Sequence, residues 1–140
     1  MKIIKISDAK FEAFMTHDEL RIILGCLNLA GEKIGRLKVS ERLGVHRDYL
    51  SDILTYSLFA MQDDSNELVE SRISFRIKKI KRNKVCAIMT SQDVIMITNC
   101  LTIVLTRTGH WEIPIIIGAE VVEIEELLYR LMEAQHLGLQ

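Results

Sequence analysis

Acidic side chains gather in two stretches of this chain, and carboxylates at such density could bind a basic protein. One group lies between the halves of the chain and the other near its C-terminal end: Asp63, Asp64, Glu67 and Glu70, and then Glu120, Glu123, Glu125 and Glu126. Residues three apart share one face of a helix, so Glu123 and Glu126 are expected to point the same way. The alternative is a solvated helix face and linker, which we favour for either group alone.

A run of basic residues near the middle of the chain could bind phosphates or an acidic partner. The candidate anion-binding residues are Arg76, Lys78, Lys81 and Arg82, with Arg72, Lys79 and Lys84 close by. Proteins that bind single-stranded nucleic acid place aromatic side chains between their cations, and this stretch offers only Phe75. We therefore favour a solvated strand face, whose charges also protect a sheet edge from pairing with another chain.

Residues 38–54, KVSERLGVHRDYLSDIL, resemble a helix-turn-helix with Gly44 at the turn. The second helix of such a motif would offer three residues to the major groove of DNA: His46, Arg47 and Ser51. Asp48 and Asp52 lie on the same expected helix and would repel phosphates. The alternative, a turn followed by an ordinary packed helix, is favoured, so nucleic acid is the less favoured partner.

The cysteines and histidines do not have the spacing of a metal site or a catalytic motif. Cys26 and Cys100 fall at equivalent positions within apolar helical stretches, so we interpret these two as small buried hydrophobic residues, while Cys86 falls within an expected strand. The four histidines are scattered along the chain: His17, His46, His110 and His136. The sequence predicts a protein without metal, cofactor or enzymatic activity.

Length and composition predict one globular domain with a substantial core. The chain has 140 residues, of which 49% are hydrophobic and 26% charged, and its net charge of −1 gives no global attraction to nucleic acid or membranes. Its longest apolar stretch, residues 94–105, is shorter than the roughly 20 residues that span a bilayer. An odd number of widely spaced cysteines does not form a disulfide framework, which indicates a cytoplasmic location.

The chain is interpreted as two copies of one unit, residues 1–66 and 75–140, related by an offset of 74. Residues 15–31, MTHDELRIILGCLNLAG, align with residues 89–105, MTSQDVIMITNCLTIVL. Identical residues recur along the whole overlap, among them Ile3/Ile77, Ala13/Ala87, Thr16/Thr90, Cys26/Cys100, Gly44/Gly118 and Ala60/Ala134. We expect a single domain built of two similar halves.

Each half is predicted to contain two strands followed by two helices, which gives an α+β fold. Thr16 and Glu19 form a candidate capping box for the first helix, and Thr90 is expected to cap the equivalent helix in the second half. We expect an antiparallel sheet of about four strands with about four helices on one face, or else a four-helix core with peripheral hairpins. Residues 94–105 are apolar on nearly every side, which predicts that their helix is the more deeply buried of the pair or lies in a dimer interface. The sequence leaves residues 111–117 open between strand and helix.

The inner faces of the last helices are predicted from their helical spacing of apolar residues. The first of these helices would bury Leu50, Ile53, Leu54, Ser57, Leu58 and Met61. The second would bury Val122, Ile124, Leu127, Leu128, Leu131 and Met132.

The pattern Thr16-x-x-Glu19-Leu20, Leu27-Asn28, Arg42-Leu43-Gly44 and Leu50-x-x-Ile53-Leu54 resembles that of short bacterial proteins. In size and layout the chain is similar to the small immunity proteins of contact-dependent and other polymorphic toxin systems. The resemblance implies a non-enzymatic protein that binds and neutralises a cognate toxin domain, and the acidic groups are the expected contact. The alternatives are a DNA-binding transcriptional regulator that uses residues 38–54 and a subunit that forms a homodimer.

Overall fold

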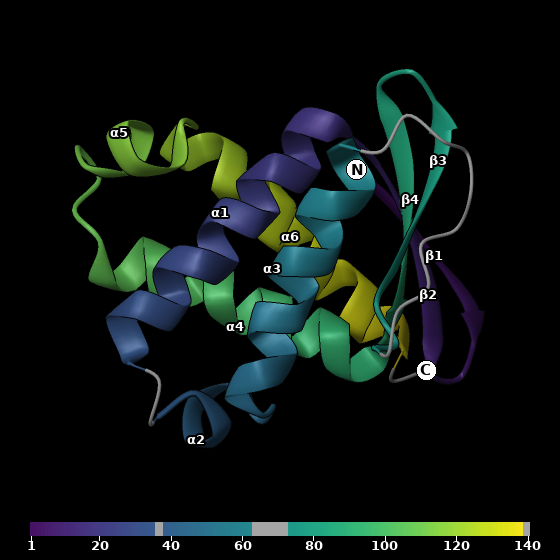
Figure 1. Cartoon of the computed structure of the whole chain (residues 1–140), viewed down its shortest axis with the longest axis horizontal. Helices are drawn as coiled ribbons and strands as arrows, with labels where there is room; N and C mark the ends of the chain where they lie inside the picture. The colour runs from purple at the N-terminus through teal and green to yellow at the C-terminus, as the bar shows by residue number, and fades with distance from the viewer. Residues whose placement is uncertain (36–37, 63–72, 139–140) are drawn as a thin grey trace.

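A computed structural model describes residues 1–35, 38–62 and 73–138, without the side chains at positions 47, 62, 81, 137 and 138. The fold is α+β, with one four-stranded antiparallel sheet and six helices in the described residues (Figure 1). The elements of the first half are β1 (Lys2–Ser7), β2 (Lys10–Thr16), α1 (His17–Ile34), α2 (Val39–Leu43) and α3 (Arg47–Gln62). Those of the second half are β3 (Arg76–Lys81), β4 (Lys84–Thr90), α4 (Ser91–Arg107), α5 (Ile113–Ile117) and α6 (Val121–Gly138).

The sheet has the order β1-β2-β4-β3, so its centre is the antiparallel pair β2 and β4. Ala13 pairs with Ala87, which lies 74 positions further along the chain, and an approximate two-fold axis therefore passes through this pair. Two further bonds obey the same symmetry, because the amide of His17 donates to Asn83 and the amide of Ser91 donates to Ala9, both at 3.1 Å. The two halves thus share one order of elements, while their origin by duplication stays a prediction.

The two central helices begin at the ends of the two central strands, where the chain changes direction through a capping box. Thr16 Oγ1 accepts the amide of Glu19 at 3.1 Å, and Glu19 Oε1 accepts the amide of Thr16 at 3.0 Å. Thr90 and Asp93 make the equivalent bonds at 3.1 and 2.9 Å. These bonds satisfy amides that the first helical turn leaves without partners, which fixes where α1 and α4 start.

One continuous core lies between the sheet and the helices. Alternate residues of the central strands point toward it: Phe11, Ala13 and Met15 on β2, and Val85, Ala87 and Met89 on β4. Helices α1 and α4 contact the central strands β2 and β4, while α6 and α3 contact the edge strands β1 and β3, and Figure 1 shows the six described helices on the same side of the sheet. Both central helices are equally deep, since Ile23 is 2% exposed and Ile97 is 1% exposed. The prediction that the second helix is more deeply buried is therefore wrong.

Each half contains three helices rather than the two predicted, because a five-residue helix precedes the last long one. Residues 111–117, left open by the sequence, include the helix α5, which has Pro114 in its first turn and is capped at its C-terminus by Gly118.

The sequence assigned too many residues to the buried faces of α3 and α6. Leu58 on α3 and Val122 and Met132 on α6 are exposed, because each helix packs on one side only and buries a narrower stripe.

In the described part of the chain, no helix combines the length and apolar character needed to cross a membrane.

Candidate functional site

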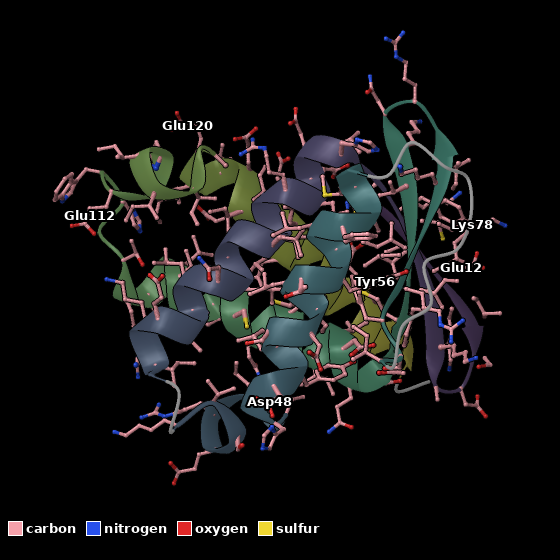
Figure 2. All side chains as sticks on the ribbon, in the orientation of Figure 1. Glu12, Asp48, Tyr56, Lys78, Glu112 and Glu120 are labelled. Carbon is pink, nitrogen blue, oxygen red and sulfur yellow. The ribbon has the colours of Figure 1, made fainter. Side chains whose placement is uncertain are left out.

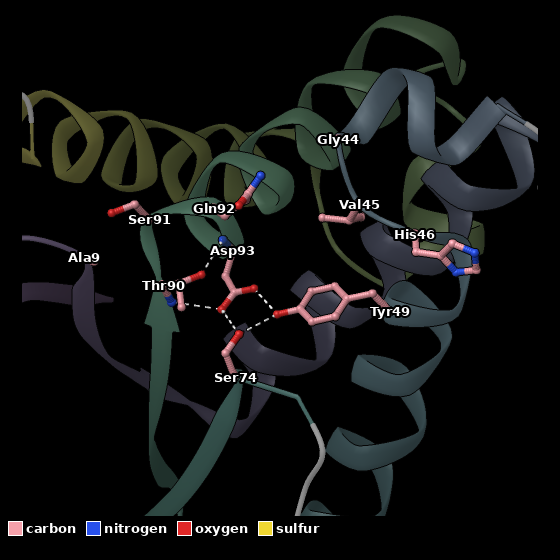
Figure 3. Close-up of a pocket in the computed structure, with 10 residues that line it drawn as sticks. All are labelled: Ala9, Gly44, Val45, His46, Tyr49, Ser74, Thr90, Ser91, Gln92 and Asp93. Carbon is pink, nitrogen blue, oxygen red and sulfur yellow. Dashed lines mark hydrogen bonds between the residues drawn. The ribbon is translucent and has the colours of Figure 1, made fainter.

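A recess of about 530 Å³ lies at the N-terminus of α4, where helix α3 approaches from the other half of the molecule. Figure 3 shows the side chains of Tyr49, Ser74 and Asp93 converging there, with His46 at its outer side. Tyr49 donates a short hydrogen bond to Asp93 Oδ1, and its hydroxyl lies 2.9 Å from that of Ser74. The recess therefore joins three segments that are far apart in the sequence.

Asp93 is buried, and donors from the protein occupy both of its carboxylate oxygens. Oδ2 accepts the amide of Thr90 at 2.9 Å and the hydroxyl of Ser74 at 3.4 Å, while Oδ1 accepts the hydroxyl of Tyr49. Burial, together with the bond to Asp93, raises the pKa of Tyr49 to about 12, so its proton stays on the phenol at neutral pH. The group ties α3 to α4 through both carboxylate oxygens of Asp93.

Glu19 occupies the position in α1 that Asp93 occupies in α4. Its second carboxylate oxygen accepts a hydrogen bond from a different donor. Glu19 Oε2 accepts the amino group of Met1 at 2.8 Å. Burial opposes ionisation of Glu19, but the bonds from this amino group and from Thr16 outweigh it and lower the pKa. The two halves therefore use the same capping geometry with different reinforcing donors.

The structure brings part of the predicted acidic surface together. Glu120, Glu123 and Glu126 are exposed at the start of α6. Glu123 and Glu126 line a recess of about 280 Å³ together with Asp18 and Glu19 of α1, which adds two carboxylates that the sequence did not place there. Glu123 also accepts the amide of Glu120 at 2.8 Å and so caps its own helix. Four predicted acidic residues lie outside the described residues: Asp63, Asp64, Glu67 and Glu70.

The segment that resembles a helix-turn-helix forms α2 and α3, with Gly44 between them at a φ of 71°. The same turn recurs at Gly118 between α5 and α6, with a φ of 78°, so the turn is not specific to a DNA-binding element. His46 and Ser51 are exposed, and the Arg47 side chain lies outside the described residues.

The surroundings of the proposed recognition helix are acidic. Asp48 and Asp52 are exposed on α3, and Ser51 lines a recess together with Asp48 and Glu32. His46 Nδ1 accepts the amide of Asp48 at 3.1 Å, so this histidine caps α3. Carboxylates at these positions oppose the approach of phosphates to this helix.

The predicted basic residues lie on strand β3 and on the turn that follows it. Arg76 and Lys78 are exposed and stand opposite Ile88 and Cys86 of β4. Figure 2 shows Lys78 and Glu12 on the side of the sheet that faces away from the helices. Arg82 is exposed in the turn, and the Lys81 side chain lies outside the described residues. The outer face of the sheet is therefore the place where these cations gather.

The three cysteines are free and buried, which confirms the predicted burial of Cys26 and Cys100 and the predicted place of Cys86 in a strand. Burial raises the pKa of both Cys26 and Cys100 to about 12, and it also raises the pKa of Cys86, with a smaller contribution from Glu12. Thiols held this far from ionisation do not act as nucleophiles at neutral pH. Among the described residues, no group of three histidine, cysteine or acidic side chains could hold a metal ion.

The two most exposed large apolar side chains lie at α5 with a third beside them, and the sequence reasoning missed them. Trp111, Ile115 and Ile116 are 73%, 75% and 52% exposed, and we name these three residues the α5 patch. The first half places Glu41 and Arg42 at the positions of Ile115 and Ile116. This replacement of charge by apolar residues is the signal that a comparison of the halves could have revealed.

The α5 patch rests on a well-anchored element. Ile113 and Ile117 of α5 are buried, and Arg21 donates to the carbonyl of Ile117 at 3.2 Å. Figure 2 shows Glu112 and Glu120 on either side of α5. The helix therefore holds its outer apolar face in water between two carboxylates.

Comparisons with protein-family models, curated proteins and solved structures gave no match for this chain. The candidate binding surface is assigned from exposure, charge and contacts alone.

Proposed function

We propose that this chain is a non-enzymatic protein that binds another protein through the α5 patch. The specific role that we propose is that of an immunity protein, which binds a cognate bacterial toxin domain and neutralises it. This role agrees with the small size and the layout of the chain, and it needs no cofactor.

The exposure of the α5 patch is the observation that carries this proposal. A tryptophan and two isoleucines within six residues of the chain are exposed to water, and exposed apolar patches with a polar rim mark interaction sites. Tryptophan is among the residues that contribute most to binding when a partner covers them. Because α5 is anchored by its buried residues, binding does not require a disordered segment to fold first.

The charges beside the patch indicate the kind of partner. Glu112 and Glu120 flank α5, and further carboxylates follow on the first turns of α6: Glu123, Glu125 and Glu126. A complementary partner offers an apolar pocket bordered by lysine or arginine side chains. Toxin domains that act on nucleic acid must bind phosphates, so they carry such basic surfaces at their active sites.

Co-expression with a toxin tests the proposed role. The toxin domain encoded by the neighbouring reading frame should arrest growth, and this chain should restore growth and co-purify with that domain. Replacing Trp111 by Ala should abolish the rescue, whereas replacing Phe59 by Ala should not. Phe59 is a matched control, because it is an exposed aromatic residue on α3. Rescue that survives the Trp111→Ala change would place the binding surface elsewhere.

The alternative function is a transcriptional regulator that reads duplex DNA through α3. The turn at Gly44 and the exposure of His46 and Ser51 favour it, while the carboxylates of Asp48 and Asp52 oppose it. A regulator would bind duplex DNA with an affinity that falls steeply as the salt concentration rises. Such binding, lost on replacing His46 and Arg47 by Ala, would support this alternative over the immunity role.

A further inference from the structure

The outer face of the sheet is a second surface with exposed apolar residues. Ile4, Ile6 and Ile80 are exposed on the edge strands, and Phe14 and Ile88 are half-buried between them. The pairing of the strands places Ile4, Phe14 and Ile88 on the face opposite to the core, while Ile6 and Ile80 lie at the register shifts of the two edge strands. All six described helices lie on the other side of the sheet (Figure 1).

This outer face is strongly basic. Its exposed cations are Lys2, Lys10, Arg76, Lys78 and Lys84. Glu12 is the one acidic residue within the four strands, and it lies among these cations. The face therefore combines an apolar centre with a positive border, and it suits a partner that is apolar and acidic.

The opposite end of the molecule has the complementary character. The α5 patch supplies apolar side chains, and carboxylates stand around it and on the first turns of α6: Glu112, Glu120, Glu123, Glu125 and Glu126. Two cations lie nearby, Arg107 and Arg21, but Arg21 is paired with Asp18 at 3.6 Å. Figure 1 shows α5 and the sheet at opposite ends of the longest axis of the molecule.

We propose that copies of this chain associate head to tail, with the α5 end of one copy on the outer sheet face of the next. The cations of the sheet face then meet the carboxylates at the α5 end, and the apolar residues of the two surfaces contact each other. An association of two identical sheet faces is disfavoured, because it would bring together two surfaces of the same positive charge. A contact between two different faces leaves one face free at each end, so the assembly grows with concentration instead of closing at a dimer.

The size of the two surfaces predicts a weak association. Each surface exposes only a few large apolar side chains, whereas a standard interface buries about 800 Å² on each partner. The contact should therefore form at high protein concentration and weaken as salt screens the charges. This association goes beyond the proposed function but uses the same α5 patch, so a bound toxin domain would compete with it.

Two variants, each with one face disabled, test the proposal. The sheet-face variant is Arg76→Glu with Lys78→Glu, and the α5-end variant is Trp111→Ala with Ile115→Glu. All four side chains are exposed, and far-ultraviolet circular dichroism checks that both variants fold. If either does not fold, Lys84→Glu replaces the sheet-face change and Glu120→Lys replaces the α5-end change. Sedimentation equilibrium then measures the average mass against concentration at low and high salt.

The head-to-tail contact predicts four results together. The mass of the wild-type protein rises beyond that of a dimer at low salt and falls at high salt, and each variant alone stays monomeric. A mixture of the two variants forms dimers and nothing larger, because each variant keeps the face that the other lacks. A wild-type mass that stays monomeric or stops at a dimer, association of either variant alone, or a monomeric mixture would each overturn the proposal. None of these results bears on toxin binding, which is measured separately.

Discussion

Tyr49 of helix α3 donates its phenolic hydrogen to Asp93 at the N-terminus of helix α4. The two residues belong to different halves of the chain, and Asp93 at the same time completes the capping box of Thr90. The bond therefore fixes the start of a central helix and the position of a peripheral helix together. Its counterpart in the other half is the contact between the amino group of Met1 and Glu19.

Replacing Tyr49 by Phe should lower the free energy of unfolding by about 1–3 kcal/mol, because a buried carboxylate loses one of its donors. Ser74 and Thr90 continue to donate to Asp93, so the protein should still fold. Urea denaturation measures the change. Tyr129→Phe is the matched control, since Tyr129 is exposed on α6 and its loss should leave stability unchanged. Equal effects of the two changes would show that the bond does not stabilise the fold.

The buried thiols should make the protein less stable in mild alkali. The pKa of Cys26 and Cys100 is raised to about 12 in the folded chain, whereas an unfolded cysteine ionises near pH 8.5. The neutral thiols therefore make their full contribution to the free energy of unfolding below pH 8.5, and this contribution is lost as the pH rises toward 12. Between pH 7.5 and pH 10, each thiol should reduce the free energy of unfolding by up to about 2 kcal/mol.

Urea denaturation at these two pH values, with a reductant present, checks the prediction. The double variant Cys26→Ala/Cys100→Ala should be less stable at pH 7.5, because it loses buried volume, but its stability should change less with pH. A variant that loses as much stability as the wild type between the two pH values would show that these thiols are not the cause.

Two glycine substitutions should have opposite effects on stability. Gly44 adopts a φ of 71°, which side chains other than glycine rarely adopt, so Gly44→Ala should destabilise the protein by about 1 kcal/mol. Gly25 lies inside α1, where an added Cβ would make ordinary contacts with Ile117 at 3.5–3.6 Å. Gly25→Ala should therefore stabilise the protein by about 0.5–1 kcal/mol through its greater helix propensity. Thermal denaturation of both variants measures the two shifts, and shifts of the same sign would contradict this interpretation.

Much of the fold could be predicted from the sequence, because its local signals and its internal similarity agree. Thr16 and Glu19 predicted the start of α1, and the 74-residue offset placed the equivalent start at Thr90. The prediction of the buried faces of α3 and α6 was less accurate, since helical spacing does not reveal that one side of each helix stays in solvent. Leu58 and Met132 were predicted to be buried, but both are exposed.

The binding surface could be predicted only in part. The sequence identified the carboxylates of Glu120, Glu123 and Glu126 from their spacing, but it could not show that α5 lies beside them. Whether Ile115 and Ile116 face the core or solvent depends on the direction of a five-residue helix, and Ile113 and Ile117 of the same helix are buried. Composition cannot separate these two pairs of isoleucines, whereas the tertiary packing does.

The most direct test of the central claim is the affinity for the toxin domain that the proposed immunity role predicts in the neighbouring reading frame, measured by isothermal titration calorimetry. Replacing Trp111 by Ala should weaken binding by at least about 30-fold, the loss expected when a central interface residue is truncated. The control Phe59→Ala should bind with the affinity of the wild type, and both variants should keep the wild-type stability. An unchanged affinity of the Trp111→Ala variant would contradict the assignment of the α5 patch as the binding surface.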